Sequence, residues 1–180
     1  MAATVAVLAL LALLLWAAIA FNRLVRGANL VREGWSGIDV QLKRRHDLLP
    51  NLVEVVRSYA DFEKTLLADI TGLRDAGRAT RALQDHENAV STQLRTVLAV
   101  AEAYPQLRAN QNFLRLQEQL AEIEDQLQMA RRYYNGTVRD HNTAIESFPS
   151  NLIAGWFRFP LQEFFQIESA VERRVPDVRL

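Results

Sequence analysis

Hydrophobic residues follow two different patterns along this chain. From residue 1 to residue 21 they are continuous except for Thr4. Beyond that stretch they recur every three or four residues, the spacing that places side chains on one face of an α-helix. The continuous stretch has the length of about 20 residues that a helix needs to cross a bilayer. We therefore predict a membrane-spanning helix followed by helices that each bury one face.

Two other interpretations of the apolar stretch are a cleaved signal peptide and a buried core helix. Ala18-Ile19-Ala20 resembles a cleavage site, but a charged n-region is missing and the apolar run exceeds the usual length of about 7–15 residues. A core helix would show a polar face, and this stretch has none. We expect an uncleaved anchor at residues 1–22 and a helical domain at residues 23–180, with Trp16 and Phe21 near the membrane interface.

The periodic positions of the domain predict three long helices. The first continues from the anchor, without a linker, to a turn at residues 75–78, the second spans residues 83–104, and the third spans residues 107–148. A short fourth helix is expected at residues 161–174. The fold class is thus all-α, an N-terminal transmembrane helix plus an antiparallel helical bundle. The predicted core-facing positions are Val31, Trp35, Ile38, Leu42, Leu49, Leu52, Val56, Tyr59, Leu66, Ile70, Leu73, Leu83, Val90, Leu94, Val97, Ala101, Tyr104, Phe113, Leu116, Leu120, Ile123, Leu127, Ala130, Tyr134, Ala144 and Phe148.

Proline and glycine mark points where the first helix should deviate from regular geometry. Pro50 removes one backbone hydrogen bond and clashes with the carbonyl four residues earlier, so we expect a kink or a helix restart there, with Asp47 as the cap. Gly27, Gly34 and Gly37 each weaken the helix by up to about 1 kcal/mol relative to alanine. They equally allow another helix to approach closely.

The predicted helices differ in length. A first helix with about 50 residues outside the anchor, a second of about 23 and a third of about 40 cannot cover one another fully at 1.5 Å per residue. Some apolar surface stays uncovered, which favours a homo-oligomer or a complex with another membrane protein.

Composition and charge narrow the classes of function. Lys and Arg number 21 and Asp and Glu number 21, so the basic face that a nucleic-acid partner requires is not indicated. The chain has no cysteine, which excludes disulfides, Cys-ligated zinc, iron–sulfur clusters and thiol nucleophiles. Arg23, Arg26 and Arg32 follow the anchor directly. The positive-inside rule therefore predicts that the N-terminus is outside and that the domain is in the cytoplasm. The three arginines either contact anionic membrane lipid as well or serve as the topological signal alone.

No arrangement of residues points to catalysis. His46, His86 and His141 lack the i, i+4 spacing of a helical zinc site, and no Glu-x-x-His pair of a di-metal bundle is present. A Gly-rich phosphate loop, a nucleophile elbow and a dinucleotide fingerprint are also missing. We expect no catalytic residue, no metal, no cofactor and no small-molecule substrate. His141, near the face of the third helix, is interpreted as a hydrogen-bonded polar group of the core.

Two segments are candidates for interaction. The first is the charged run Arg44, Arg45, His46 and Asp47 beside Pro50. These side chains either cap the carbonyls exposed by a kink or form a docking site in which arginines meet carboxylates.

The second candidate is an aromatic segment. Five of the eight phenylalanines lie between residues 148 and 165, and Trp156, Phe157 and Phe159 occur together in its turn-rich part. It is interpreted as a cap folded onto the bundle, a docking surface for another chain, or a membrane contact. Three helices that run away from the membrane, back and away again would put residue 148 at the far end, which favours the cap.

Three separated blocks of the chain resemble the LemA family of bacterial membrane proteins. They lie at residues 40–54 (VQLKRRHDLLPNLVE), at 99–114 (AVAEAYP through NQNFL) and at 131–151 (RRYYN through SFPSN). The resemblance implies an N-terminal span, an antiparallel helical bundle and location in the bacterial inner membrane, and it supplies no catalytic residues. The chain departs from the family pattern at Gly136, where an aspartate is expected after Asn135.

These observations predict a non-enzymatic, membrane-anchored helical scaffold or adaptor that faces the cytoplasm and self-associates. The alternative is an accessory or regulatory subunit of a membrane-bound enzyme or quality-control protease. An enzyme with an unrecognised site is the third hypothesis.

Overall fold

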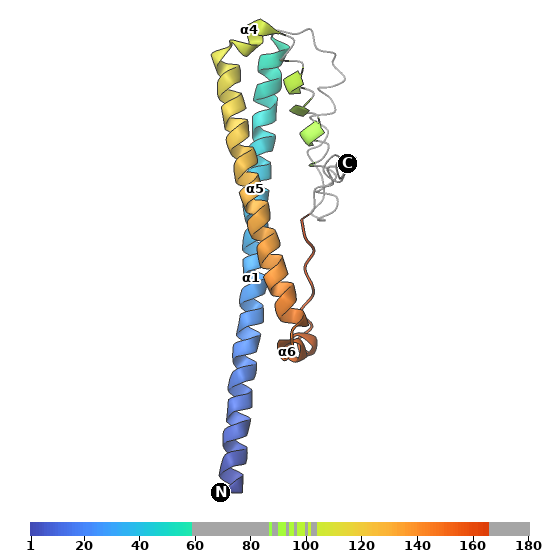
Figure 1. The fold of residues 1–180 in the computed structure, drawn as a ribbon. Helices are drawn as coiled ribbons and strands as arrows, with labels where there is room; N and C mark the ends of the chain where they lie inside the picture. The colour runs from blue at the N-terminus through green and yellow to red at the C-terminus, as the bar shows by residue number, and fades with distance from the viewer. Residues whose placement is uncertain are drawn as a thin grey trace, which may run out of the picture. The chain divides into compact units, whose positions relative to one another are not determined.

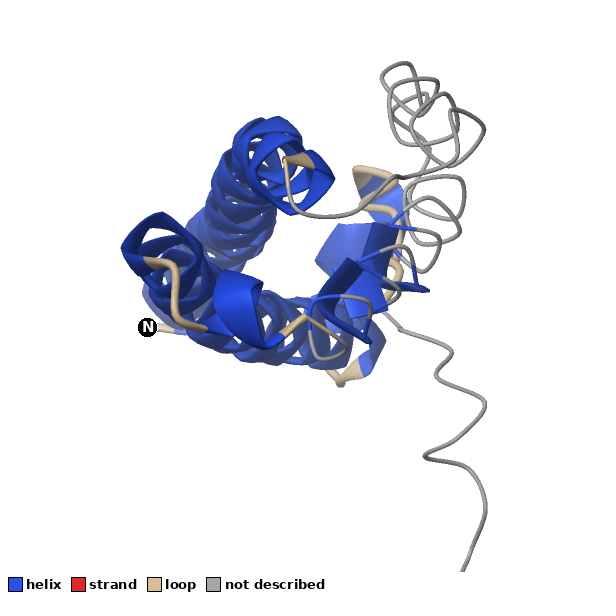
Figure 2. Cartoon of the chain, turned by 90° about the horizontal axis from the view of Figure 1, so that it is seen from above, coloured by secondary structure: helices blue, strands red, loops and turns tan. Residues whose placement is uncertain are grey.

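A computed structural model of the chain describes residues 1–58, 87, 90–92, 94–95, 97–99, 101 and 104–165 (Figure 1). These residues form helices and connecting segments, and the described part contains no β-strand (Figure 2). The all-α prediction is therefore confirmed for them. The helices are α1 (Ala2–Arg57), α4 (Pro105–Arg108), α5 (Gln111–Glu146) and α6 (Ser150–Trp156), and the described residues from 87 to 101 are helical as well.

The chain packs into two compact units, and both α1 and α5 contribute to each of them. Unit 1 comprises residues 1–40 and 127–164, and unit 2 comprises residues 41–126 and 165–180. The predicted boundary at residue 22 coincides with no helix end, because α1 runs through it without interruption. The boundary of the anchor stays a prediction, whereas its continuity with the first helix of the domain is confirmed.

In unit 1, α1 and α5 lie antiparallel and in close contact. Gly27 is next to His141, Gly34 is next to Tyr134, and Gly37 is next to Ala130, so positions ascend along α1 as they descend along α5. A Cβ added at Gly27 would lie 2.7 Å from Nδ1 of His141, and one at Gly34 would lie 3.1 Å from Cα of Tyr134. The first two glycines therefore permit the close approach that the sequence suggested. At Gly37 the nearest atom would be 3.9 Å away, which is ordinary contact.

The apolar part of α1 is exposed. Among the described helices, α1 contains the one stretch long and apolar enough to cross a membrane, and only 6% of that stretch is buried. A core helix would be mostly buried, so its exposure argues against that interpretation. Burial begins at Ala20 and Leu24, which are 8% and 0% exposed. The end of the apolar stretch is thus part of the packing of unit 1.

Unit 2 has a core built from three helical segments. Leu52 and Val56 of α1 pack with Val90 and Val97 and with Phe113 of α5, and each of these five is at most 3% exposed. This burial confirms the periodic positions predicted for this part of each helix.

The connection into α5 is fixed by two local features. Pro105 occupies the first turn of α4, where its missing N–H costs nothing, and Leu107 is fully buried in the core. Oδ1 of Asn110 then accepts hydrogen bonds from the backbone N–H groups of Asn112, at 2.8 Å, and Phe113, at 3.2 Å. This is the capping interaction that begins a helix, so the expected third helix is divided into α4 and α5.

Several other predictions about the elements are wrong. No helix restarts at Pro50, which lies inside α1, so Asp47 is not an N-cap. The other alternative at Pro50, a kink, stays a prediction. Tyr104 is 40% exposed because the chain leaves helical geometry before Pro105. Phe148 is 79% exposed because α5 ends at Glu146 and the chain turns away.

The C-terminal part also differs from expectation. The helix α6 forms inside the aromatic segment, where only turns were expected, and residues 161–165 are not helical. The rest of the helix predicted at residues 161–174 lies outside the described residues. So do the turn predicted at residues 75–78 and the expected core positions Tyr59, Leu66, Ile70, Leu73 and Leu83.

Candidate functional site

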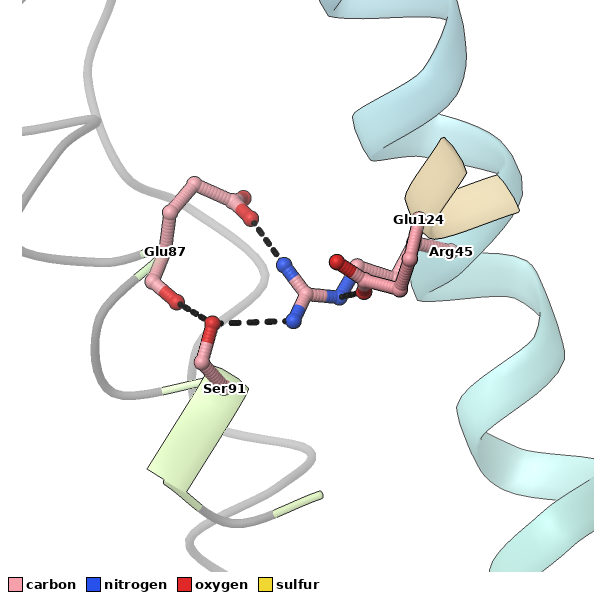
Figure 3. A network of polar contacts seen from close by, with 4 residues as sticks. All are labelled: Arg45, Glu87, Ser91 and Glu124. Carbon is pink, nitrogen blue, oxygen red and sulfur yellow. Dashed lines mark hydrogen bonds and ion pairs between the residues drawn. The ribbon is translucent and has the colours of Figure 1, made fainter. Parts of the chain in front are cut away.

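Arg45 is the centre of a buried polar cluster in unit 2. Its guanidinium donates from Nη1 to Oε2 of Glu87, at 3.0 Å, and from Nη2 to Oγ of Ser91, at 2.9 Å (Figure 3). The Ser91 hydroxyl in turn donates to the backbone carbonyl of Glu87, at 2.8 Å. Nε of Arg45 lies 2.9 Å from Oε1 of Glu124, an ion pair whose orientation falls outside hydrogen-bond geometry. The cluster joins α1, α5 and the helical residues near 90.

This cluster has a structural role. The side chains of Arg45 and Glu87 are only 3% and 7% exposed, whereas that of Glu124 is 35% exposed. Burying a charge costs free energy because the charge loses its contacts with water, and only close, well-oriented partners offset this cost. The planar guanidinium of arginine can form several such contacts at once. Arg45 therefore pairs with side chains inside the fold. The two interpretations offered for it from the sequence, a cap and a docking site, stay predictions.

The neighbours of Arg45 differ from it in exposure. Arg44 and Asp47 are exposed, and His46 is half-buried. Arg44 and Asp47 line a groove of about 420 Å³ in unit 2. The complete lining is Gln41, Arg44, Asp47 and Leu48 from α1, and Gln119, Glu122, Ile123 and Gln126 from α5. We call this the polar groove. It combines charges of both signs and amides with two apolar residues.

The second candidate segment lies in unit 1, beside the end of the apolar stretch. The ring of Phe157 is 4.7 Å from that of Phe21, and the ring of Phe159 is 5.8 Å from it. Trp156 is 84% exposed, Phe157 is 55% exposed and Phe159 is half-buried. The segment therefore does not lie at the far end of the bundle, and the topological argument for a distant cap is wrong. Because α5 runs antiparallel to α1, its C-terminal end returns to the anchor.

Two side chains of α5 hold this segment in place. The Asn142 side chain donates to the carbonyl of Gln162 and accepts from its N–H, both at 2.9 Å. The Tyr134 hydroxyl donates to the carbonyl of Glu163, at 2.8 Å. Burial and, secondly, the Glu163 carboxylate raise the pKa of Tyr134, which keeps this donor protonated. Sequence reasoning did not assign these roles, although both residues lie in the third block of the family resemblance.

His141 is buried without hydrogen bonds. It is 2% exposed, and neither ring nitrogen has a hydrogen-bond partner in the described part of the chain. Its ring meets that of Phe159 edge to face, with centroids 6.4 Å apart. Burial lowers the pKa of this imidazole, so the neutral form is favoured. The expectation of a core position is confirmed, whereas that of a hydrogen-bonded group is wrong.

Metal-binding and catalytic sites were not expected. Within residues 1–58, 104–165 and the described positions between them, no group of three or more His, Asp or Glu side chains converges to hold a metal ion. The polar groove brings together Gln, Arg, Asp and Glu, and it contains no nucleophile next to a base.

Comparison with known proteins is decisive for the family. The model of the LemA family matches residues 34–180, most of the chain. The chain belongs to the LemA family. It is 22% identical to magnetosome protein MamQ 2 of Paramagnetospirillum magneticum in an alignment of 195 positions, which covers 92% of this chain and 72% of the relative.

Two further relatives are similarly distant. Magnetosome protein MamQ of Magnetospirillum gryphiswaldense is 21% identical over 92% of this chain and 72% of its own length. Protein LemA of Metamycoplasma hominis is 25% identical in an alignment of 137 positions, which covers 74% of this chain and 63% of that protein. The resemblance recognised in the three sequence blocks is thus confirmed.

Proposed function

We propose that this LemA-family protein is a non-enzymatic, membrane-anchored helical adaptor that associates with copies of itself through the polar groove. The anchor is the apolar part of α1, and the domain faces the cytoplasm at the bacterial inner membrane, in keeping with Arg23, Arg26 and Arg32 after the span. The observation that carries the proposal is the composition of the polar groove.

The polar groove can be complementary to a copy of itself. Arg44 on α1 and Glu122 on α5 are both exposed and line the same groove of unit 2. Two-fold symmetry brings one patch against its own copy, so each residue of a contacting pair appears twice. Arg44 of one copy can then meet Glu122 of the second, and the reverse pair forms on the other side of the axis. Leu48, which is half-buried, supplies apolar contact between these pairs.

The relatives carry two kinds of name. Two of them are named for the magnetosome, whereas the mycoplasma protein is named for the family alone. We propose that family members share the helical bundle and differ in what they assemble with. An accessory or regulatory subunit of a membrane-bound enzyme or quality-control protease is the alternative, and it would use the same groove for a different polypeptide.

A charge exchange tests self-association. Arg44→Glu and Glu122→Arg are introduced singly and together into the full chain, and the mass of the complex is measured in membrane nanodiscs. Each single variant should lose the oligomer through like-charge repulsion, and the double variant should restore it. Arg108→Glu is the matched control, because Arg108 is exposed in the same unit and does not line the groove.

The outcomes separate the hypotheses. Restoration by the double variant, with an unaffected control, supports the proposed pairing. The accessory subunit would be favoured if the wild-type complex contains a second polypeptide. In that case both single variants should lose the complex, and the double variant should not restore it. A wild-type chain that runs as single copies would contradict self-association.

A further inference from the structure

Among the large apolar side chains that the aromatic segment of unit 1 leaves exposed, three stand out by their exposed fraction. Phe148, Leu152 and Trp156 are 79%, 60% and 84% exposed. Leu152 and Trp156 are four residues apart in α6 and so share one face of it, whereas Ala154 is 2% exposed and faces the protein. Apolar side chains that gather in this way mark a contact with a membrane or another protein.

The position of this face in unit 1 favours the membrane. Phe157 contacts Phe21, the last residue of the apolar stretch, and Phe148 lines a groove together with Trp16 and Ile19 of that stretch. Asn22 and Arg23 follow, so the helix leaves the hydrocarbon at this point. The exposed face of α6, which carries Trp156, is therefore beside the end of the span, at the depth where tryptophan is enriched.

The groove beside α6 has the amphipathic lining that a phospholipid requires. We call it the interfacial groove, and its volume is about 570 Å³. Trp16, Ile19 and Phe148 form its apolar side, and Arg23 and Arg139 contribute two positive charges to its polar side. Asp140 also lines it and lies 4.0 Å from Nε of Arg139, so one positive charge remains in excess. Trp16 and Ile19, which belong to the span, lie on the apolar side of the groove. An acyl chain bound on this side would therefore point towards the hydrocarbon of the bilayer.

We propose that α6 and its surroundings form a second membrane contact. Phe148, Leu152 and Trp156 insert among the headgroups of the leaflet that adjoins the domain, and the interfacial groove holds a phospholipid with its phosphate between Arg23 and Arg139. The inference rests on the membrane anchor of the proposed function and is independent of self-association. Two contacts with the bilayer, one spanning and one interfacial, fix the rotation of the unit 1 hairpin about the anchor.

The absence of cysteine makes the contact measurable. Single cysteines introduced at Leu152 and Trp156 carry a nitroxide label in the full chain, reconstituted in vesicles of phosphatidylglycerol and phosphatidylethanolamine. Labels at Leu11, in the span, and at Met129, an exposed position of α5, provide the references. Because all four residues are more than half exposed, the substitutions remove little packing. Collision of each label with oxygen and with a water-soluble nickel chelate gives its depth.

The expected ratio of oxygen to nickel accessibility at residues 152 and 156 lies between those of the two references. Values equal to that of Met129 would overturn the proposal, and low accessibility to both reagents would overturn it in favour of a protein contact. If the label at Leu11 is itself in water, the anchor fails as well. If the label at Leu11 is in lipid while the labels at residues 152 and 156 are in water, the second membrane contact is contradicted and the anchor is not.

A second measurement tests the interfacial groove. Binding of spin-labelled phosphatidylglycerol, relative to phosphatidylcholine, should weaken about fivefold for each of Arg23→Gln and Arg139→Gln, the effect expected of one basic residue near anionic lipid. Arg132→Gln is the control, since Arg132 is an exposed residue of α5 that does not line the groove. An equal loss in all three variants would indicate general surface charge and would overturn the assignment of the groove.

Discussion

At the scale of single residues, the energetics of the domain depend on a few polar groups and close contacts. Arg45 is buried on α1 between the apolar positions Leu42 and Leu49, and the sequence singled it out as part of the charged run beside Pro50. What the sequence could not supply was the partner, because Glu87 and Glu124 come from segments far away in the chain. Sequence periodicity predicts which face of a helix is buried, but not which other helix meets it.

Replacing Arg45 should destabilise unit 2 strongly. Arg45→Met leaves the buried Glu87 carboxylate without its cationic partner, and the expected loss in the free energy of unfolding is about 3–5 kcal/mol. Adding Glu87→Gln to this variant should recover part of the loss, because the remaining group is neutral. Denaturant unfolding in detergent measures both effects. A single variant as stable as wild type would contradict the role assigned to the cluster.

Gly27 should tolerate no side chain. The Cβ of Gly27→Ala would lie 2.7 Å from Nδ1 of His141, so we expect a loss of about 1–3 kcal/mol despite the better helix propensity of alanine. Gly136→Ala is the matched control in the same unit, because a Cβ there meets nothing within 4 Å. This variant should gain up to about 1 kcal/mol. Equal effects of the two substitutions on the melting temperature would refute the close contact.

His141 should make the stability of unit 1 depend on pH. Its folded-state pKa is lowered below the ordinary value of 6.5 by burial, so the unfolded state binds this proton at higher pH than the folded state does. The stability that the neutral imidazole contributes to the folded state is complete above pH 6.5, and it is lost as the pH falls below that value. Melting temperatures measured between about pH 8 and about pH 5 should decline less for His141→Gln than for wild type. Identical declines would exclude this residue as the cause.

At the scale of elements, the long helices were easier to predict than the short one. The periodic apolar positions of α1 and α5 extend over many turns, so their existence and buried faces could be predicted from the sequence. The seven residues of α6 are too few to show a period, and Pro149 and Gly155 beside or within them indicated a turn. The conformation of such a short segment depends on tertiary packing. Phe21 and Phe159 are an example, since they are far apart in the sequence and adjacent in unit 1.

The direction of α5 was the main error at this scale. Counting three helices after the anchor placed residue 148 away from the membrane, whereas Gly27 and His141 meet and place it beside the anchor. The sequence singled out Trp156, Phe157 and Phe159 as one aromatic cluster, and Phe157 and Phe159 both meet Phe21 in unit 1. The location of this cluster could not be inferred, because a periodic pattern contains no information about the order in which helices pair.

At the scale of the whole molecule, one helix joins the proposed membrane anchor to the proposed surface for self-association. The α1 helix carries the apolar stretch, the contacts of unit 1 and one side of the polar groove of unit 2, without a break from Ala2 to Arg57. The family was evident from the sequence because its blocks are long and ordered. The polar groove was not evident from the sequence, which singled out only Arg44 and Asp47 among its residues. The residues of α5 that complete the groove are separated from them by more than 70 positions.

The most direct test of self-association is photo-crosslinking in native membranes. A photoreactive amino acid replaces Gln119, which lines the polar groove, or Gln106, an exposed glutamine of the same unit that does not. The account predicts a crosslinked dimer of this chain from position 119 and none from position 106. The absence of a dimer from position 119, or equal dimer yields from both positions, would contradict it.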